Sequence, residues 1–188
     1  MKGSIKIVLL ALVPILFIQC SSAKLVKIEK QNKETIKNWF EEGWNKSKYI
    51  ATIEKTFSKD WADGNPLLPG QLDGIPGMRQ LVEYYSGGFP DLNFKISHMI
   101  ADGNYVLARI LVNGTHKGTV FGIPATGTKV STTGIIIYEF KGDKVKTTWQ
   151  ELDLTALMNQ IRHASTIELK DTKGDKKYAG VGKPRLPE

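Results

Sequence analysis

The hydrophobic period of this chain changes near Pro90, and this change constrains the fold more than any other feature. Before Pro90, apolar residues recur at three- and four-residue steps, as they do on one face of a helix. After Pro90, apolar and polar residues alternate, as they do in strands with one buried face. Helices followed by hairpin-connected strands predict an α+β domain in which an antiparallel sheet packs against N-terminal helices.

Three helices are expected in the first half of the chain. The first begins near Glu34, and the second begins near Ser47, a residue type that is favourable at an N-cap. The third begins near Pro76, which suits a first helical turn, and it stops at the glycines at 87–88. A loop rich in Gly, Pro and Asp spans residues 60–74 and separates the second helix from the third.

The second half of the chain predicts four strands and a short C-terminal helix. The expected strands are residues 92–100, 105–116, 129–140 and 145–152, and the helix begins near Leu154. Tight turns that contain glycine join two pairs of these strands. The residues from 164 to 188 are polar and lack a hydrophobic period, so they are expected to form an extended or disordered tail.

Residues 1–23 have the pattern of an export signal: lysines, a short apolar run and then small residues. The chain is therefore expected to be exported, with residues 24–33 as a tether or the first turn of a helix. Cys20 is the only cysteine, and its position resembles that of the lipidated cysteine in a bacterial lipoprotein anchored to the membrane. Ordinary cleavage after Ala23 is the alternative, and it would give a periplasmic or secreted protein.

The composition argues against several partners. The formal net charge is +7, but the lysines are dispersed and form no basic helix, so no nucleic-acid partner is expected. A membrane is expected as a partner only through the signal or a lipid anchor. The three histidines do not have the spacing of metal ligands, and no metal site is expected. The sequence contains neither a phosphate loop nor the G-x-S-x-G motif of acyl-enzyme chemistry.

Asp153 directly follows the last expected strand, and continued alternation places it on the same face as Trp149. The opposite face carries Lys144 and Lys146 and is expected to meet solvent, so Asp153 should point inward. A carboxylate against an aromatic wall loses hydration, which raises its pKa and suits a general base. Asp153 also directly precedes the last helix, where aspartate is a favoured N-cap, and this structural role stays open.

His116 and Arg109 both belong to the second expected strand. His116 could donate a hydrogen bond to a substrate carbonyl or shuttle a proton, or it could satisfy nearby backbone. Arg109 could stabilise an enolate, or it could face solvent from a half-exposed strand. Alternation puts the two on opposite faces, so both reach one cavity only if a bulge lies between them, for example at Gly114.

Several aromatic side chains could line a pocket or could belong to the plain core. They are Trp39 and Tyr85 on expected helices, Phe89 after the third helix and Trp149 on the last strand.

Four short motifs follow one another in the second half of the chain. They are G-G-F-P-D-L at 87–92, G-T-H-K-G at 114–118, G-I-P-A-T-G at 122–127 and W-Q-E-L-D at 149–153. In this order and spacing they resemble the SnoaL-like polyketide cyclases, or ester cyclases, of the NTF2-like superfamily. The resemblance covers residues 39–161. It implies a cone in which a curved antiparallel sheet, three N-terminal helices and a short C-terminal helix enclose an apolar cavity within a domain of residues 34–163.

The resemblance also implies a chemistry. Well-understood members of the family close a polyketide ring by intramolecular aldol condensation, without a metal or a cofactor, and often as homodimers. Asp153 matches the aspartate that serves there as acid and base, and His116 matches the pocket histidine. Arg109 matches a position that is often basic. A small apolar or carbonyl-containing ligand, no cofactor and a possible homodimer are therefore expected.

These residues are compatible with more than one function. The first is an exported, cofactor-free cyclase or isomerase, in which Asp153 removes a proton alpha to a carbonyl while His116 and Arg109 stabilise the enolate. The second is a non-catalytic ligand-binding lipoprotein, in which Asp153 is only a helix cap. A third, resembling the epoxide hydrolases, would need an Asp-Arg-Asp set, and the sequence offers no evident second aspartate.

Overall fold

The computed structural model describes residues 23–171, and it describes side chains as far as residue 163. Cys20 and almost all of the expected export signal therefore lie outside the described residues, as does the last part of the expected tail, residues 172–188. Of the helices that the structure describes, none combines the length and the hydropathy that crossing a bilayer requires.

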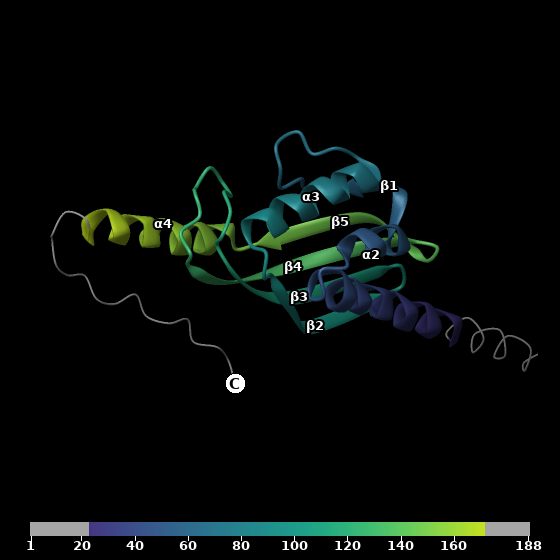
Figure 1. The fold of residues 1–188 in the computed structure, drawn as a ribbon. Coiled ribbons are helices and arrows are strands. Elements are labelled where there is room, and N and C mark those ends of the chain that lie inside the picture. The colour runs from purple at the N-terminus through teal and green to yellow at the C-terminus, as the bar shows by residue number, and fades with distance from the viewer. Residues whose placement is uncertain (1–22, 172–188) are drawn as a thin grey trace, which may run out of the picture.

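A five-stranded sheet forms the centre of the domain (Figure 1), with its strands in the order β1-β5-β4-β3-β2. The strands are β1 (Phe57–Asp63), β2 (Asn93–Asp102), β3 (Tyr105–Thr115), β4 (Lys129–Lys141) and β5 (Lys144–Leu152). Strands β2 to β5 pair antiparallel in chain order, and β1 pairs parallel with β5 at the edge. The four strands expected from the alternating pattern are all present, and the α+β class is confirmed.

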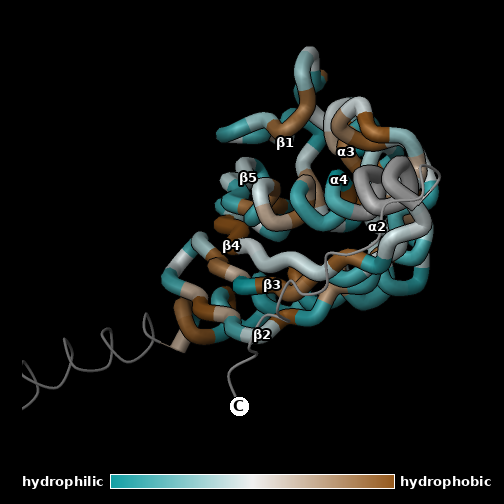
Figure 2. The backbone as a smooth tube through the Cα atoms, turned by 90° about the vertical axis from the view of Figure 1, so that its left-hand side faces the viewer, coloured by the Kyte–Doolittle hydropathy of each residue, from teal (hydrophilic) through white to brown (hydrophobic). Residues whose placement is uncertain are grey.

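Helices gather on one face of this sheet (Figure 2), where α2, α3 and α4 lie on the same side of the strands. The chain is helical over residues 23–38, continues as the π-helix η1 (Trp39–Trp44), and then forms α2 (Tyr49–Thr56), α3 (Gly74–Gly88) and α4 (Leu154–Asp171). Residues 24–33, expected as a tether or the first turn of a helix, are thus helical, and α4 runs through 164–171, where a tail was expected. Residues 24–33 contain four lysines, and residues 164–171 contain Ala164, Glu168, Leu169 and Lys170; all of these are good helix formers even without an apolar period.

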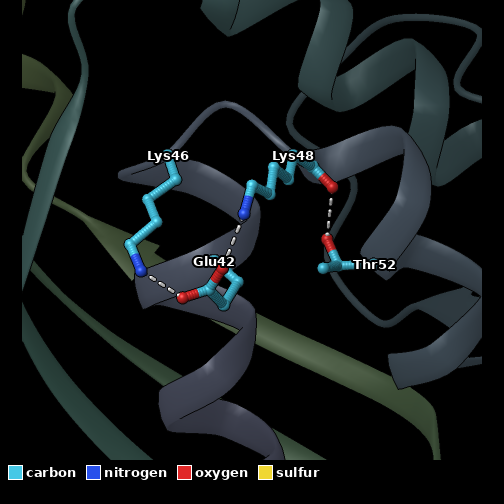
Figure 3. A network of polar contacts seen from close by, with 4 residues as sticks. All are labelled: Glu42, Lys46, Lys48 and Thr52. Atoms are coloured by element: carbon cyan, nitrogen blue, oxygen red, sulfur yellow. Dashed lines mark hydrogen bonds and ion pairs between the residues drawn. The ribbon is translucent and has the colours of Figure 1, made fainter.

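A small polar network fixes the turn between η1 and α2 (Figure 3). Glu42 forms ion pairs with Lys46 and Lys48, and the Lys48 Nζ lies 3.1 Å from Glu42 Oε2. The Thr52 hydroxyl donates to the Lys48 carbonyl at 3.0 Å, at the start of α2. Ser47 was expected to cap this helix, but it has a φ of 54° and lies before the actual N-cap residue, Lys48. Exposed ion pairs contribute little stability, so this network chiefly sets the direction of the turn.

The core fills the space between the helices and the inner face of the sheet. Every second residue of β3 points inward and is buried, as the alternating pattern requires: Val106, Ala108, Ile110 and Val112. Trp39 and Phe40 of η1 pack against this layer from the helical side, and Trp61 from β1 is fully buried. This apolar burial supplies the main driving force for the fold.

Strand β1 was not expected, because its residues were assigned to the end of a helix and the start of a loop. Its buried residues are Phe57 and Trp61, whose spacing of four is typical of a helix. The pairing of β1 with β5 shifts between Phe57 and Ala62, which indicates a bulge or irregularity. The irregular strand breaks the alternation that would have identified it.

Candidate functional site

A cavity of about 90 Å³ lies between the inner face of the sheet and the helices η1 and α3. This volume is several times what one water molecule needs. Its walls are mostly aromatic and aliphatic, and Trp39, Tyr85 and Phe89 line it. Three of the four aromatic side chains proposed for a pocket therefore meet at one cavity, and their contact with a ligand stays a prediction.

Few polar side chains reach this cavity. They are Tyr85, Thr132, Tyr138, Thr148 and Gln150, and among the described residues no Asp, Glu, His, Lys or Arg lines it. Burial raises the pKa of Tyr85 and of Tyr138, so both phenols keep their protons and remain hydrogen-bond donors at physiological pH. The cavity therefore suits a mostly apolar molecule with few polar atoms.

A bulge in β5 reverses the expected faces of that strand. Glu139 pairs with Thr147 and Phe140 with Val145, so Lys146 is an extra residue without an opposite partner. Beyond the bulge, Thr148 and Gln150 point inward and are buried, whereas Trp149 is 36% exposed. The expectation that Trp149 faces inward is therefore wrong, because it assumed uninterrupted alternation.

Asp153 is the N-cap of α4. Its Oδ1 accepts a hydrogen bond from the backbone N–H of Ala156 at 2.9 Å, three residues into the helix. The residue is exposed and does not line the cavity, although its neighbours Leu152 and Leu154 both do. The expected inward direction of Asp153 is thus wrong for the same reason as that of Trp149, and only its two chain neighbours reach the cavity wall.

His116 follows β3 and is fully buried behind the cavity wall. Its Nδ1 lies 3.0 Å from the Thr126 hydroxyl oxygen, and its ring packs against Phe89 with a centroid distance of 5.4 Å. Burial lowers the pKa of His116, which keeps the ring neutral at physiological pH. His116 does not line the cavity itself, and it supports Phe89, which does.

Arg109 lies on the outer face of the sheet. Its neighbours Ala108 and Ile110 point inward and are buried, and its Nη1 donates to the Ser97 hydroxyl at 3.0 Å. Strands β3 and β4 pair in regular register through Gly114, so the bulge that could have turned Arg109 and His116 to one side is not there. The structure therefore does not bring Arg109 to the cavity.

Sequence reasoning missed a carboxylate beside the cavity, that of Asp63 at the end of β1. Its Oδ2 accepts hydrogen bonds from Gln71 Nε2 at 2.8 Å and from Gln150 Nε2 at 2.9 Å. Its Oδ1 accepts one from the backbone N–H of Asn65 at 3.2 Å. This cluster could not be identified from the sequence, because it depends on the bulge in β5. The bulge turns Gln150 inward, and the alternation of residues along the strand does not reveal it.

Metal ligands do not gather in this region. Within the part of the chain that the structure describes, no three His, Cys, Asp or Glu side chains lie where they could hold one metal ion.

Comparison with known proteins finds a family model and solved structures that are similar to this chain. A family model described as SnoaL-like polyketide cyclase matches residues 34–161. A putative SnoaL-like polyketide cyclase from Jannaschia sp. CCS1 is 23% identical, with a TM-score of 0.64 over 71% of this chain and 93% of that one. A putative polyketide cyclase from Acidithiobacillus ferrooxidans is 29% identical, with a TM-score of 0.62 over 71% of this chain and 96% of that one.

A third similar structure is IdmH, a putative polyketide cyclase from Streptomyces antibioticus. It is 21% identical, with a TM-score of 0.60 over 70% of this chain and 99% of that one. Among curated proteins, none matches the chain. The resemblance and the NTF2-like cone expected from the sequence motifs are confirmed.

Proposed function

Because the chain belongs to the SnoaL-like polyketide cyclase family, we propose that it is a cofactor-free enzyme of cyclase or isomerase type that acts on a small carbonyl compound. The observation that carries this proposal is the cavity, whose apolar walls include only a few neutral polar groups. Such surroundings strengthen each hydrogen bond to a developing enolate, because little water competes for it.

The proposed reaction begins at a C–H bond alpha to the carbonyl. A base removes the proton, and the electron pair of the broken bond forms the enolate. In an isomerase the base returns the proton to another carbon. In a cyclase the enolate carbon attacks a second carbonyl of the same molecule, the C=O double bond opens, and the base returns the proton to that oxygen to give a hydroxyl. We assign the base to Asp153, which lies between the cavity-lining residues Leu152 and Leu154. To act, its carboxylate must release the hydrogen bond from Ala156 and turn from the solvent toward the cavity.

The other expected residues take different parts in this proposal. His116 acts as a support for Phe89 and not as a direct contact of the ligand, because it lies behind the wall. Arg109 takes no part in the chemistry, because it is on the opposite face of the sheet.

A second candidate function is a non-catalytic protein that binds a small apolar molecule. The geometry of Asp153 favours it, since an exposed carboxylate that caps a helix needs no catalytic role to explain it.

Proton exchange in D2O distinguishes the enzymatic function from the non-catalytic one. The wild-type protein is expected to accelerate deuterium incorporation at the α-carbons of 2-tetralone above the rate in buffer, as measured by proton NMR. The hydrocarbon tetralin is expected to inhibit this exchange, because it occupies the same cavity without offering an acidic proton. Binding of 2-tetralone without accelerated exchange would favour the non-catalytic function, and absence of binding by either molecule would contradict both.

We also propose that the protein is exported and that Cys20 carries a lipid. Support comes from the sequence alone: a lysine-containing start, a short apolar run and the single cysteine after it. Metabolic labelling with a fatty acid tests the proposal, and a wild-type protein that takes up no label would contradict the lipid anchor.

A homodimer is proposed from the uncovered face of the sheet. Ile100, Leu107, Ile137 and Trp149 are in register across four strands, and Ile100 is 64% exposed. An apolar row of this kind on an open face is typical of an interface between protein chains. Sedimentation velocity on the purified protein measures whether this assembly forms.

A further inference from the structure

We infer that Tyr85 and Gln150, two of the polar side chains that line the cavity, bind a neutral carbonyl oxygen of the ligand, and that Asp63 is the positioning residue that holds Gln150 in place. This inference rests on the proposed function, because it assumes that the cavity takes a small molecule. It assigns the contacts that recognise the ligand, which neither the motifs nor the family match identify.

Tyr85 supplies the first part of the argument. Its side chain extends from α3 and lines the cavity, yet its hydroxyl is buried and has no hydrogen-bond partner among the described residues. A buried polar group without a partner is rare and calls for an explanation. The adjacent Tyr84 behaves differently, because its hydroxyl accepts a hydrogen bond from the backbone N–H of Phe121 at 2.7 Å. The free Tyr85 hydroxyl is therefore available to a ligand.

The protonation of Tyr85 and the charge of Asp63 determine which ligand group can bind to the Tyr85 hydroxyl. Burial raises the pKa of Tyr85, and the carboxylate of Asp63 nearby adds to this effect, so the phenol stays protonated and acts as a donor. An acceptor atom is needed opposite it. A ligand carboxylate would be repelled by Asp63 and would lose its hydration among apolar walls. A ketone, aldehyde or ester oxygen accepts the same hydrogen bond without that cost.

Gln150 is the second polar group, and its orientation is fixed. Its side chain lines the cavity from β5, and its Nε2 donates to Asp63 Oδ2 at 2.9 Å. Its backbone N–H donates to the Asn65 side-chain oxygen at 2.8 Å. Gln71 donates to the same Asp63 oxygen at 2.8 Å, which holds the carboxylate from a second side. Asp63 does not line the cavity, so it acts through Gln150 and through its charge.

A pair of probes of equal shape tests the carbonyl contact. In 4-fluoro-α-methylstyrene a CH2 group replaces the oxygen of 4-fluoroacetophenone, and fluorine NMR titration measures the affinity of both. Tyr85→Phe is expected to weaken binding of the ketone about threefold to tenfold and to change binding of the alkene by less than about twofold. Tyr84→Phe is the matched control, because it removes the same hydroxyl from the neighbouring residue, and it is expected to leave the ratio of the two affinities unchanged.

Asp63→Asn tests the positioning residue with a readout that a structural role would not move. This change keeps the size of the side chain and removes its charge. We expect weaker binding of the ketone, unchanged binding of the alkene, and a gain in affinity for a third probe, 4-fluorobenzoate, because the repulsion of its carboxylate is lost.

The possible results distinguish an error in the proposed carbonyl site from an error in the proposed binding of a small molecule by the cavity. If the ketone and the alkene bind to the wild type and Tyr85→Phe changes both equally or neither, the carbonyl site is wrong and the binding cavity stands. If Asp63→Asn leaves the affinities for the ketone and for 4-fluorobenzoate unchanged, the role of Asp63 is wrong. If neither the ketone nor the alkene binds to the wild type, the binding cavity itself is wrong, and the inference falls with it.

Discussion

Asp153→Asn is expected to lower the rate of α-proton exchange by at least about 100-fold, because a general base contributes about 10²- to 10⁴-fold to such reactions. The free energy of unfolding is expected to stay within about 0.5 kcal/mol of the wild type, because asparagine caps helices as well as aspartate does. Its side-chain oxygen can still accept the hydrogen bond from Ala156 that Asp153 accepts at 2.9 Å. Exchange of 2-tetralone and urea unfolding measure the two quantities on the same samples.

Asp153→Ala separates the cap from the base. Alanine removes both, so this variant should lose the exchange activity and in addition about 1 kcal/mol of stability. An Asn variant with wild-type exchange and an Ala variant with only the stability loss would show that the carboxylate is a cap alone. The base would then have to be sought elsewhere, or the non-catalytic function adopted.

Gly77→Ala is expected to destabilise the domain by about 3 kcal/mol, because the added methyl group has no room. A Cβ at this position would lie 1.6 Å from the Leu72 carbonyl oxygen and 2.6 Å from its carbon. Both atoms belong to backbone, so a rotamer change cannot relieve the overlap, and the loop before α3 must shift. Urea unfolding followed by tryptophan fluorescence measures the loss.

Gly87→Ala is the matched control on the same helix. Nothing lies within 4 Å of a Cβ built there, so the change should raise the stability by about 0.5 kcal/mol through the smaller conformational freedom of the unfolded chain. Equal effects of the two substitutions would contradict the steric explanation for Gly77.

Much of the fold could be predicted because the pattern that identifies it is local. Alternation gave β2, β3, β4 and β5 to within about two residues, and the apolar stripe with Pro76 and the terminal glycines gave α3. Strand β1 could not be found in this way. Its place at the edge depends on parallel pairing with β5, a contact that is distant in sequence.

The candidate site was less predictable than the fold. Trp39 and Tyr85 reach the cavity because the helical period turns them toward the sheet, and Phe89 reaches it from the residue that directly follows α3. The direction of every residue after Val145 depended instead on one bulge, and strict alternation sent Trp149 and Asp153 to the wrong side. The Asp63 cluster joins β1, a loop and β5, so its members meet only in the folded chain.

The extra residue in β5 has an evolutionary consequence. Deleting Lys146 would remove the bulge and leave Thr148 and Gln150 facing inward, because the remaining residues would alternate regularly from Val145. The bulge therefore absorbs one inserted residue in this hairpin without changing which side chains reach the binding wall. The wall can keep its residues while the strand that carries them gains or loses a single codon.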